Sequence, residues 1–225
     1  RQRQMCIRDR NKRLLIKYMN EIRTLNKENL ALGIEYLKKA DPDLKKILHE
    51  RKDKINSFKK ASGFEGLISL IVEQQLSVAS AKAIFNRVKK VQEKISPESF
   101  LEIDENILRS TGLSRQKVSY CRNIATAIMS GELNIKGLNK LENTQVVEQL
   151  TKIKGIGDWT AQCYLMACMK RIDAWPSSDL GLIIAIQRIR GMEERPKSLT
   201  IKKIAEPWKP FRSIAALLLW STYDK

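Results

Sequence analysis

Asp179 is the residue whose sequence setting most suggests chemistry. It follows Pro176 and two serines, and it precedes an apolar stretch from Leu180 to Ile189 with the composition of a helix. This order predicts that Asp179 lies at a helix N-terminus, where free N–H groups and the helix dipole favour an ionised carboxylate. Because aspartate at such a position is usually a structural cap, the local sequence alone favours the cap over a catalytic role.

A glycine-containing segment, LTKIKGIGDWTA over residues 150–161, lies between two helical patterns. Gly155 and Gly157 allow a tight turn and a close approach of the backbone to a partner. N–H groups at the start of the second helix would then be available to a phosphate, and Lys152 and Lys154 add positive charge beside them. A plain helical hairpin would have the same pattern, but the net charge of +17 favours phosphate binding.

The strongly positive net charge of the chain indicates what kind of molecule it binds. Lys and Arg number 42 against 25 Asp and Glu, and a positive excess of this size favours a polyanion, most simply nucleic acid. The alternative is a charge that serves solubility alone. The sequence has no run of about 20 apolar residues and no apolar N-terminal stretch of signal-peptide type, which favours a cytoplasmic or nuclear protein without a membrane partner.

Cysteine and histidine content excludes several kinds of site. The four cysteines (Cys6, Cys121, Cys163 and Cys168) have neither zinc nor iron–sulfur spacing, so we expect buried, reduced thiols. The single histidine, His49, lies in a charged segment and is expected to be solvated. A histidine-rich metal site and histidine-dependent nucleophilic catalysis are therefore disfavoured.

Apolar periodicity and helix punctuation predict an all-α fold. Residues 1–30 are expected to be a basic tail, either a disordered or artefactual end or an arm that touches DNA, and residues 31–225 a single functional domain. Gly112 and Gly131 are expected to end helices. The expected helices span residues 34–40, 44–48, 64–72, 77–91, 97–110, 114–130, 144–153 and 180–189.

Five segments follow one another along the chain: FEGLISLIVEQQLSVASAKAIFNRV, TGLSRQKVSYCRNIA, LTKIKGIGDWTA, DAWPSSDLG and WKPFRSIAALLLW. In this order they resemble the HhH-GPD superfamily of base-excision DNA glycosylases, specifically its DNA-3-methyladenine glycosylase II branch. The resemblance implies two packed helical subdomains, a helix-hairpin-helix motif at about residues 144–169, and a DNA-binding cleft between the subdomains. It implies removal of alkylated purines, such as 3-methyladenine, from double-stranded DNA by a monomer with no required cofactor.

The resemblance reverses the interpretation of Asp179. Its carboxylate would stabilise an oxocarbenium-like sugar as the N-glycosidic bond breaks, and would orient or deprotonate the attacking water. Glycosylases with lyase activity carry a Schiff-base lysine near the hairpin, whereas this chain has Trp159 at that position. Water would therefore be the nucleophile, and the product would be an abasic site.

The resemblance also implies a pocket for a flipped base, held between flat side chains. Trp159 and Trp220 are the first candidates, and Cys163 stands where a related enzyme has a pocket tyrosine. An electron-rich ring would attract a cationic N-alkylated purine. Weaker candidates are Tyr164 and Trp175, and Trp208 is assigned to the core.

Two segments are implied to contact DNA. One of the residues in the turn after residue 73, Gln75 or Leu76, would fill the gap left by the flipped nucleotide, although an ordinary interhelix turn is the alternative. A monovalent cation would be held by hairpin carbonyls of Thr151, Ile153 and Ile156. The full set of DNA-binding candidates is Gln74, Gln75, Leu76, Ser77, Lys152, Lys154, Gly155, Ile156, Gly157 and Thr160.

Two other functions are compatible with the sequence. One is a non-catalytic DNA-binding module that uses the hairpin for phosphate contact. The other is a monofunctional glycosylase for a different lesion, uracil or hypoxanthine. The combination of Asp179 with Trp159 and Trp220 favours the enzyme over the binding module.

Overall fold

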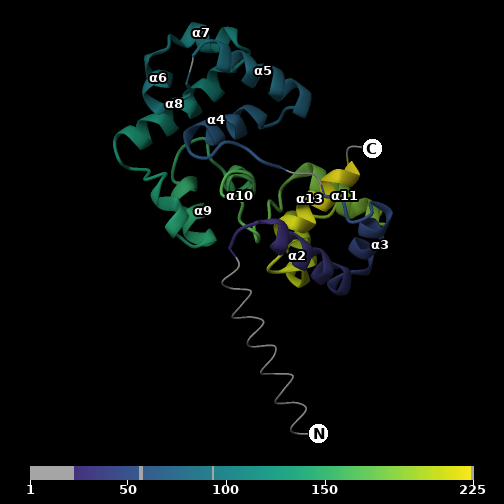
Figure 1. Cartoon of the computed structure of the whole chain (residues 1–225). Helices are drawn as coiled ribbons and strands as arrows, with labels where there is room; N and C mark the ends of the chain where they lie inside the picture. The colour runs from purple at the N-terminus through teal and green to yellow at the C-terminus, as the bar shows by residue number, and fades with distance from the viewer. Residues whose placement is uncertain (1–22, 56–57, 93, 224–225) are drawn as a thin grey trace, which may run out of the picture. The chain divides into compact units, whose positions relative to one another are not determined.

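A computed structural model describes residues 23–55, 58–92 and 94–223, and these residues form helices (Figure 1). Within these ranges there are twelve α-helices and two short 3-10 helices, and the only β-type pairing is an isolated bridge between Thr24 and Arg171. The all-α prediction is confirmed. None of the helices in the described ranges has the length and apolar character that crossing a lipid bilayer requires.

The chain divides into two compact units. Residues 58–169 form one, called here the central unit, and the described parts of residues 1–57 and 170–225 form the other, called the terminal unit. The predicted tail falls mostly on residues 1–22, which lie outside the described residues, as does Cys6. The first described helix begins at Lys27.

The terminal unit is built from both ends of the described chain. Figure 1 shows α2, near the N-terminus, beside α13, near the C-terminus, and the two helices are in contact. Helices α11 and α13 also pack against each other. The elements of this unit are α2 (Lys27–Ala40), α3 (Pro42–Glu50), α11 (Leu180–Ile189), α12 (Ser198–Ile204), the 3-10 helix η2 (Glu206–Trp208) and α13 (Arg212–Tyr223).

A buried carboxylate, Asp41, ties three parts of the terminal unit together. It caps α3 by accepting from the backbone N–H groups of Asp43 at 3.0 Å and Leu44 at 3.2 Å. Its other oxygen accepts from the Trp208 indole at 2.9 Å and forms an ion pair with Arg190, the C-cap of α11. Because the donors surround one carboxylate, the charge is buried with partners that compensate its lost hydration.

The central unit has α4 (Phe64–Glu73) at its centre, in contact with α5, α8 and α10. This helix buries residues around almost its whole circumference, from Phe64 to Val72, as expected for a helix packed on several sides. The other elements are α5 (Val78–Lys90), α6 (Pro97–Glu102), α7 (Glu105–Ser110), α8 (Arg115–Met129), the 3-10 helix η1 (Gly137–Lys140), α9 (Asn143–Thr151) and α10 (Asp158–Ala167).

The prediction of one helix over residues 97–110 is wrong. The chain leaves helical geometry at Ile103, which is extended (φ −69°, ψ 134°), and α7 then begins after Asp104. The Asp104 side chain accepts from the Asn106 N–H at 2.8 Å and so starts a new helix. A capping aspartate inside an apparently continuous pattern is the signal that separates α6 from α7.

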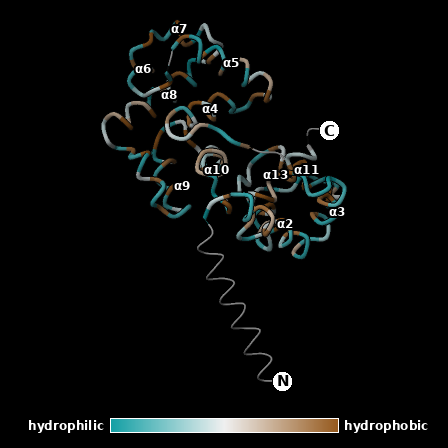
Figure 2. The backbone as a smooth tube through the Cα atoms, in the orientation of Figure 1, coloured by the Kyte–Doolittle hydropathy of each residue, from teal (hydrophilic) through white to brown (hydrophobic). Residues whose placement is uncertain are grey.

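Several burial predictions are confirmed. Trp208 is fully buried, Cys121, Cys163 and Cys168 are buried, and His49 is exposed. Figure 2 shows hydrophobic and hydrophilic residues alternating along the turns of helices such as α9, which buries Val146 and Leu150. Gly112 and Gly131 have positive φ angles and follow the ends of α7 and α8, as predicted.

The Asp41 cluster generates a prediction about stability. Asp41→Asn keeps one oxygen for capping but turns an NH₂ group toward the Arg190 and Trp208 donors, so we expect a loss of about 2–4 kcal/mol in the free energy of unfolding. Urea denaturation monitored by circular dichroism measures this loss. Asp43→Asn is the matched control, because Asp43 also pairs with Arg190, at 2.5 Å, but its side chain is 36% exposed. The control should lose less than about 1 kcal/mol, and equal losses would contradict the assigned role of Asp41.

Candidate active site

Asp179 lies directly before α11 and is half-buried. Its Oδ1 atom accepts the Leu182 N–H at 2.9 Å, so the predicted helix cap is confirmed. The same oxygen accepts the indole N–H of Trp220, on α13, at 2.8 Å. The helix N-terminus and the indole therefore place two N–H dipoles against one carboxylate oxygen, which fixes the orientation of the carboxylate.

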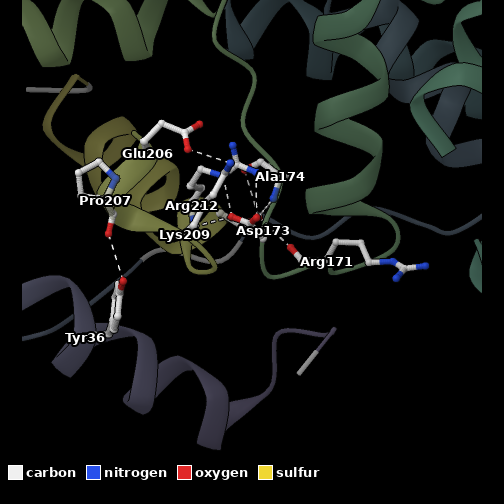
Figure 3. Close-up of polar contacts among 9 residues, drawn as sticks. Tyr36, Arg171, Asp173, Ala174, Glu206, Pro207, Lys209 and Arg212 are labelled. Carbon is white, nitrogen blue, oxygen red and sulfur yellow. Dashed lines mark hydrogen bonds and ion pairs between the residues drawn. The ribbon is translucent and has the colours of Figure 1, made fainter. Parts of the chain in front are cut away.

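The loop before Asp179 is clamped to the start of α13. The Arg212 guanidinium donates to both oxygens of Asp173, at 2.7 and 2.8 Å (Figure 3). The next residue, Ser213, accepts the Ala174 N–H at 2.9 Å and donates to the Arg171 carbonyl at 2.8 Å. A two-point ion pair with a planar guanidinium restricts rotation as well as distance, so this end of the loop is firmly held.

The middle of the same loop is held by packing and a hydroxyl contact. Trp175 is 4% exposed and makes an edge-to-face contact with Trp208, with ring centroids 5.4 Å apart. Ser177 is buried, and its hydroxyl lies 2.9 Å from that of Ser198 on α12. Helix α13 thus binds the loop at its start through Arg212 and at its end through Trp220, and the position of the Asp179 carboxylate follows from both.

The glycine-containing segment forms the predicted turn between α9 and α10. Gly155 has φ +110°, and a Cβ atom there would lie 2.4 Å from Cγ of Tyr120, so both the backbone angle and the available space require glycine. Ile153 and Ile156 point into the core while Lys152 and Lys154 are exposed. Helix α10 begins without a side-chain cap, which leaves its first N–H groups suited to an anion.

The turn between α4 and α5 joins this hairpin directly. The side-chain amide of Gln74 donates to the Gly155 carbonyl at 3.0 Å and to the Thr160 hydroxyl at 2.9 Å. Thr160 is only 1% exposed and Gln74 is half-buried, so both side chains lie beneath the surface of the turn and support it. Their role in contacting DNA stays a prediction. Gln75 and Leu76 are exposed, and Ser77 caps α5 by accepting the Ser80 N–H at 3.2 Å.

The predicted base-contacting residues fall in different places. Trp220 is together with Asp179 in the terminal unit, whereas Trp159 lies half-buried in the first turn of α10, in the central unit. Cys163 is fully buried, and the Tyr164 hydroxyl accepts the Gly63 N–H at 3.2 Å. Burial raises the pKa of Tyr164 far above its ordinary value, so its hydroxyl stays neutral. Their roles in a base pocket remain predictions.

Sequence reasoning missed the residues that position this site. Asp173 and Arg212 lie within quoted motifs, but no local pattern indicates that they pair across 39 positions. Lys117, on α8, donates to the carbonyls of Val72 and Gln74 at 2.7 and 2.8 Å and was not assigned a role either. A main-chain carbonyl has no sequence signature, so such a partner cannot be found from spacing.

The helical hairpin, the proline-containing loop and the aspartate that follows it define a family. A family model described as HhH-GPD superfamily base excision DNA repair protein matches residues 68–210, more than half of the chain. The chain therefore belongs to the HhH-GPD superfamily of base excision DNA repair proteins.

Individual relatives agree with this assignment. DNA-3-methyladenine glycosylase 1 of Schizosaccharomyces pombe is 34% identical over 170 residues, which cover 74% of this chain and 75% of the relative. The solved structure of the 3-methyladenine DNA glycosylase Mag1 of that yeast in complex with abasic DNA superposes with a TM-score of 0.80 at 29% identity, covering 86% of this chain and 97% of the other. A DNA-3-methyladenine glycosidase from Bacillus halodurans superposes with a TM-score of 0.66 at 31% identity, covering 81% and 89% of the two chains.

The loop clamp generates a local prediction. In Arg212→Met the side chain keeps its length but loses both bonds to Asp173, so the amide protons of Ala174 and Ser213 should exchange with solvent about tenfold faster or more. Amides of α8 should keep their wild-type rates. Hydrogen exchange followed by NMR measures both sets.

A neighbouring ion pair provides the matched control. Lys209 pairs with Glu206 at 2.9 Å beside the clamp (Figure 3), but both side chains are about half exposed, at 46% and 56%. Lys209→Met should therefore leave the exchange rates of the loop unchanged. Equal acceleration in the two variants would show that the Asp173–Arg212 pair does not hold the loop.

Proposed function

We propose that this protein is a monofunctional DNA glycosylase that removes alkylated purines, 3-methyladenine among them, from double-stranded DNA and leaves an abasic site. The observation that carries the proposal is the Asp179 carboxylate, held by the Leu182 and Trp220 N–H groups at the end of a clamped loop. Its family and the names of the relatives that it resembles support the same activity.

The carboxylate acts on the sugar. As the bond between C1′ and the base nitrogen breaks, its electron pair leaves with the base and positive charge develops on C1′ and the ring oxygen. The negative charge of Asp179 stabilises that charge, and the fixed carboxylate requires little reorganisation as the reaction proceeds. Water then adds to C1′, and its proton passes to Asp179 or to solvent, so that the products are the free base and an abasic sugar.

Aromatic side chains would favour a positively charged base. An N-alkylated purine carries a formal positive charge, and the face of a tryptophan ring attracts a cation. Trp220 is the proposed side chain for this role, and the hydrogen bond from its indole N–H to Asp179, the proposed reacting group, supports it. A weakened glycosidic bond in such a base adds to the selectivity, because the leaving group departs more easily. The second ring around the base, Trp159, stays a prediction.

Water is the nucleophile in this proposal because Trp159 stands where related lyases carry a Schiff-base lysine. Lys152 and Lys154 are the lysines beside the turn, and both are exposed, where they can bind the DNA backbone. We expect base release and strand cleavage to be separate events.

The hairpin is the proposed contact with the DNA backbone. The N-terminus of α10 and the two lysines would bind phosphate. A monovalent cation is proposed at the same turn. The end of α9 at Thr151, where the last carbonyls lie beyond intrahelical bonding, supports the proposal. The Ile153 carbonyl accepts one hydrogen bond, from Ile156, and keeps a second lone pair. Bound by carbonyls of Thr151, Ile153 and Ile156, the cation would add positive charge beside the phosphate.

The central test replaces the carboxylate and its donor separately. Asp179→Asn keeps the cap but removes the charge, so single-turnover release of 3-methyladenine from methylated duplex DNA should fall by about 100-fold or more. Trp220→Phe keeps a ring but removes the N–H, and release should fall by about tenfold. Melting temperature and duplex affinity should stay close to wild type in both.

A second helix-capping aspartate supplies the control for these variants. Asp104 caps α7 by accepting the Asn106 N–H at 2.8 Å, outside the proposed site. Asp104→Asn should leave the release rate unchanged. If Asp179→Asn released base as fast as Asp104→Asn does, Asp179 would be a structural cap only.

The choice of nucleophile is tested by the fate of the DNA strand. The wild-type protein should leave the strand intact until alkali is added, and borohydride should trap no covalent complex, because no Schiff base forms. Gel electrophoresis of labelled duplex, with and without alkali, separates base release from cleavage. A borohydride-trapped complex or strand cleavage without alkali would overturn the monofunctional assignment.

A further inference from the structure

Lys117, on α8, directs its ammonium group at main-chain carbonyls of the central unit rather than at solvent. Its ammonium group donates to the carbonyls of Val72 and Gln74, at 2.7 and 2.8 Å, at the point where α4 ends. Burial lowers the pKa of Lys117 from its ordinary value, which is the cost of removing an ammonium group from water. A positive charge at the C-terminal end of a helix also interacts favourably with the helix dipole.

The turn that Lys117 holds has a geometry that needs support. Gln75 is in left-handed geometry, with φ +57°, although it is not a glycine. Such a residue persists only where its surroundings fix it. Leu76, in the turn, is apolar and 41% exposed, and Val78, the first residue of α5, is 81% exposed. The turn therefore presents apolar groups to the outside in a strained conformation.

The same face of α8 also binds the hairpin. The Tyr120 ring fills the space beside Gly155, and the Asn123 side chain donates to the Lys154 carbonyl at 3.3 Å. Residues 117, 120 and 123 are three positions apart, so they lie along one side of the helix. Gln74 completes the set by linking the turn to Gly155 and Thr160. One face of α8 thus fixes the exposed turn and the phosphate-binding hairpin with respect to each other.

We propose that Lys117 is a positioning residue that holds the Gln74–Ser77 turn rigid beside the hairpin, so that backbone binding at the hairpin presses Gln75 and Leu76 into the base stack. The proposal rests on the proposed function, because it requires that the hairpin binds duplex DNA. Inserting side chains between bases costs unstacking energy, and only a turn that keeps its conformation can impose that cost on the DNA. Lys117 itself does not touch the DNA or the reacting atoms.

A positioning role differs from a merely structural one in its dependence on the substrate. A damaged base in a duplex must be unstacked and its gap filled, whereas the same base in a single strand needs neither. Loosening the turn should therefore slow release from duplex DNA and largely spare release from single-stranded DNA. General destabilisation of the protein would slow both to the same extent.

The experiment compares three variants. Lys117→Met removes the ammonium group, Lys117→Arg restores a donor of the same charge, and Arg122→Met is the matched control. Arg122 is also on α8 and donates to a main-chain carbonyl, that of Ile103 at 2.6 Å, but it does so at the end of α6. Single-turnover release of 7-methylguanine is measured for one methylated strand, alone and in duplex, with 2-aminopurine opposite the lesion to report unstacking.

We expect Lys117→Met to lower the duplex rate by about tenfold or more and the single-strand rate by less than about threefold, with loss of the 2-aminopurine signal on binding. Lys117→Arg should recover most of the signal, and Arg122→Met should keep the wild-type ratio of the two rates. A parallel fall in both rates, or a 2-aminopurine signal in Lys117→Met equal to wild type, would overturn the proposal. If wild-type protein released no base from either DNA, the proposed function would fail, and the 2-aminopurine signal would still decide the role of Lys117.

Discussion

The hydrogen bond from Trp220 to Asp179, added to the cap at Leu182, sets the direction of the Asp179 carboxylate, and the proposed site depends on that direction. A catalytic carboxylate must keep its charge and a fixed direction, yet remain accessible to a sugar. Burial alone would favour the neutral acid, and full exposure would leave the group mobile. Helix α13 supplies the fixed direction, because it binds the loop through Arg212 and the carboxylate through Trp220.

The central unit uses a different principle to shape its surface. Lys117, Gln74 and Asn123 all donate to main-chain carbonyls, and each carbonyl belongs to a turn or a helix end. Carbonyls at these positions lack partners within their own helix, so side chains from α8 and from the turn itself supply them. The exposed side chains of the turn and hairpin are thereby left to face a ligand, while the backbone beneath them is fixed.

The sequence predicted the parts of the molecule that local chemistry determines. The Asp179 cap, the turn at Gly155 and the buried Trp208 all follow from residue type and near neighbours. The single helix expected over residues 97–110 failed because a capping aspartate, Asp104, competes with continued helical periodicity. The pairing of Asp173 with Arg212 and the reach of Lys117 to Val72 join residues far apart in the chain, and only the packed fold brings them together.

The two aspartates at the ends of this loop, Asp173 and Asp179, have different kinds of hydrogen-bond donor. An arginine placed against Asp179 would orient it well, but it would also cancel the negative charge that a developing oxocarbenium ion needs. In this loop the guanidinium of Arg212 is bound to Asp173, and the contacts from Leu182 and Trp220 to Asp179 come from uncharged N–H groups. Dipoles orient a carboxylate without neutralising it. An ion pair therefore supplies rigidity six residues before Asp179, and the N–H groups of Leu182 and Trp220 supply direction at Asp179 itself.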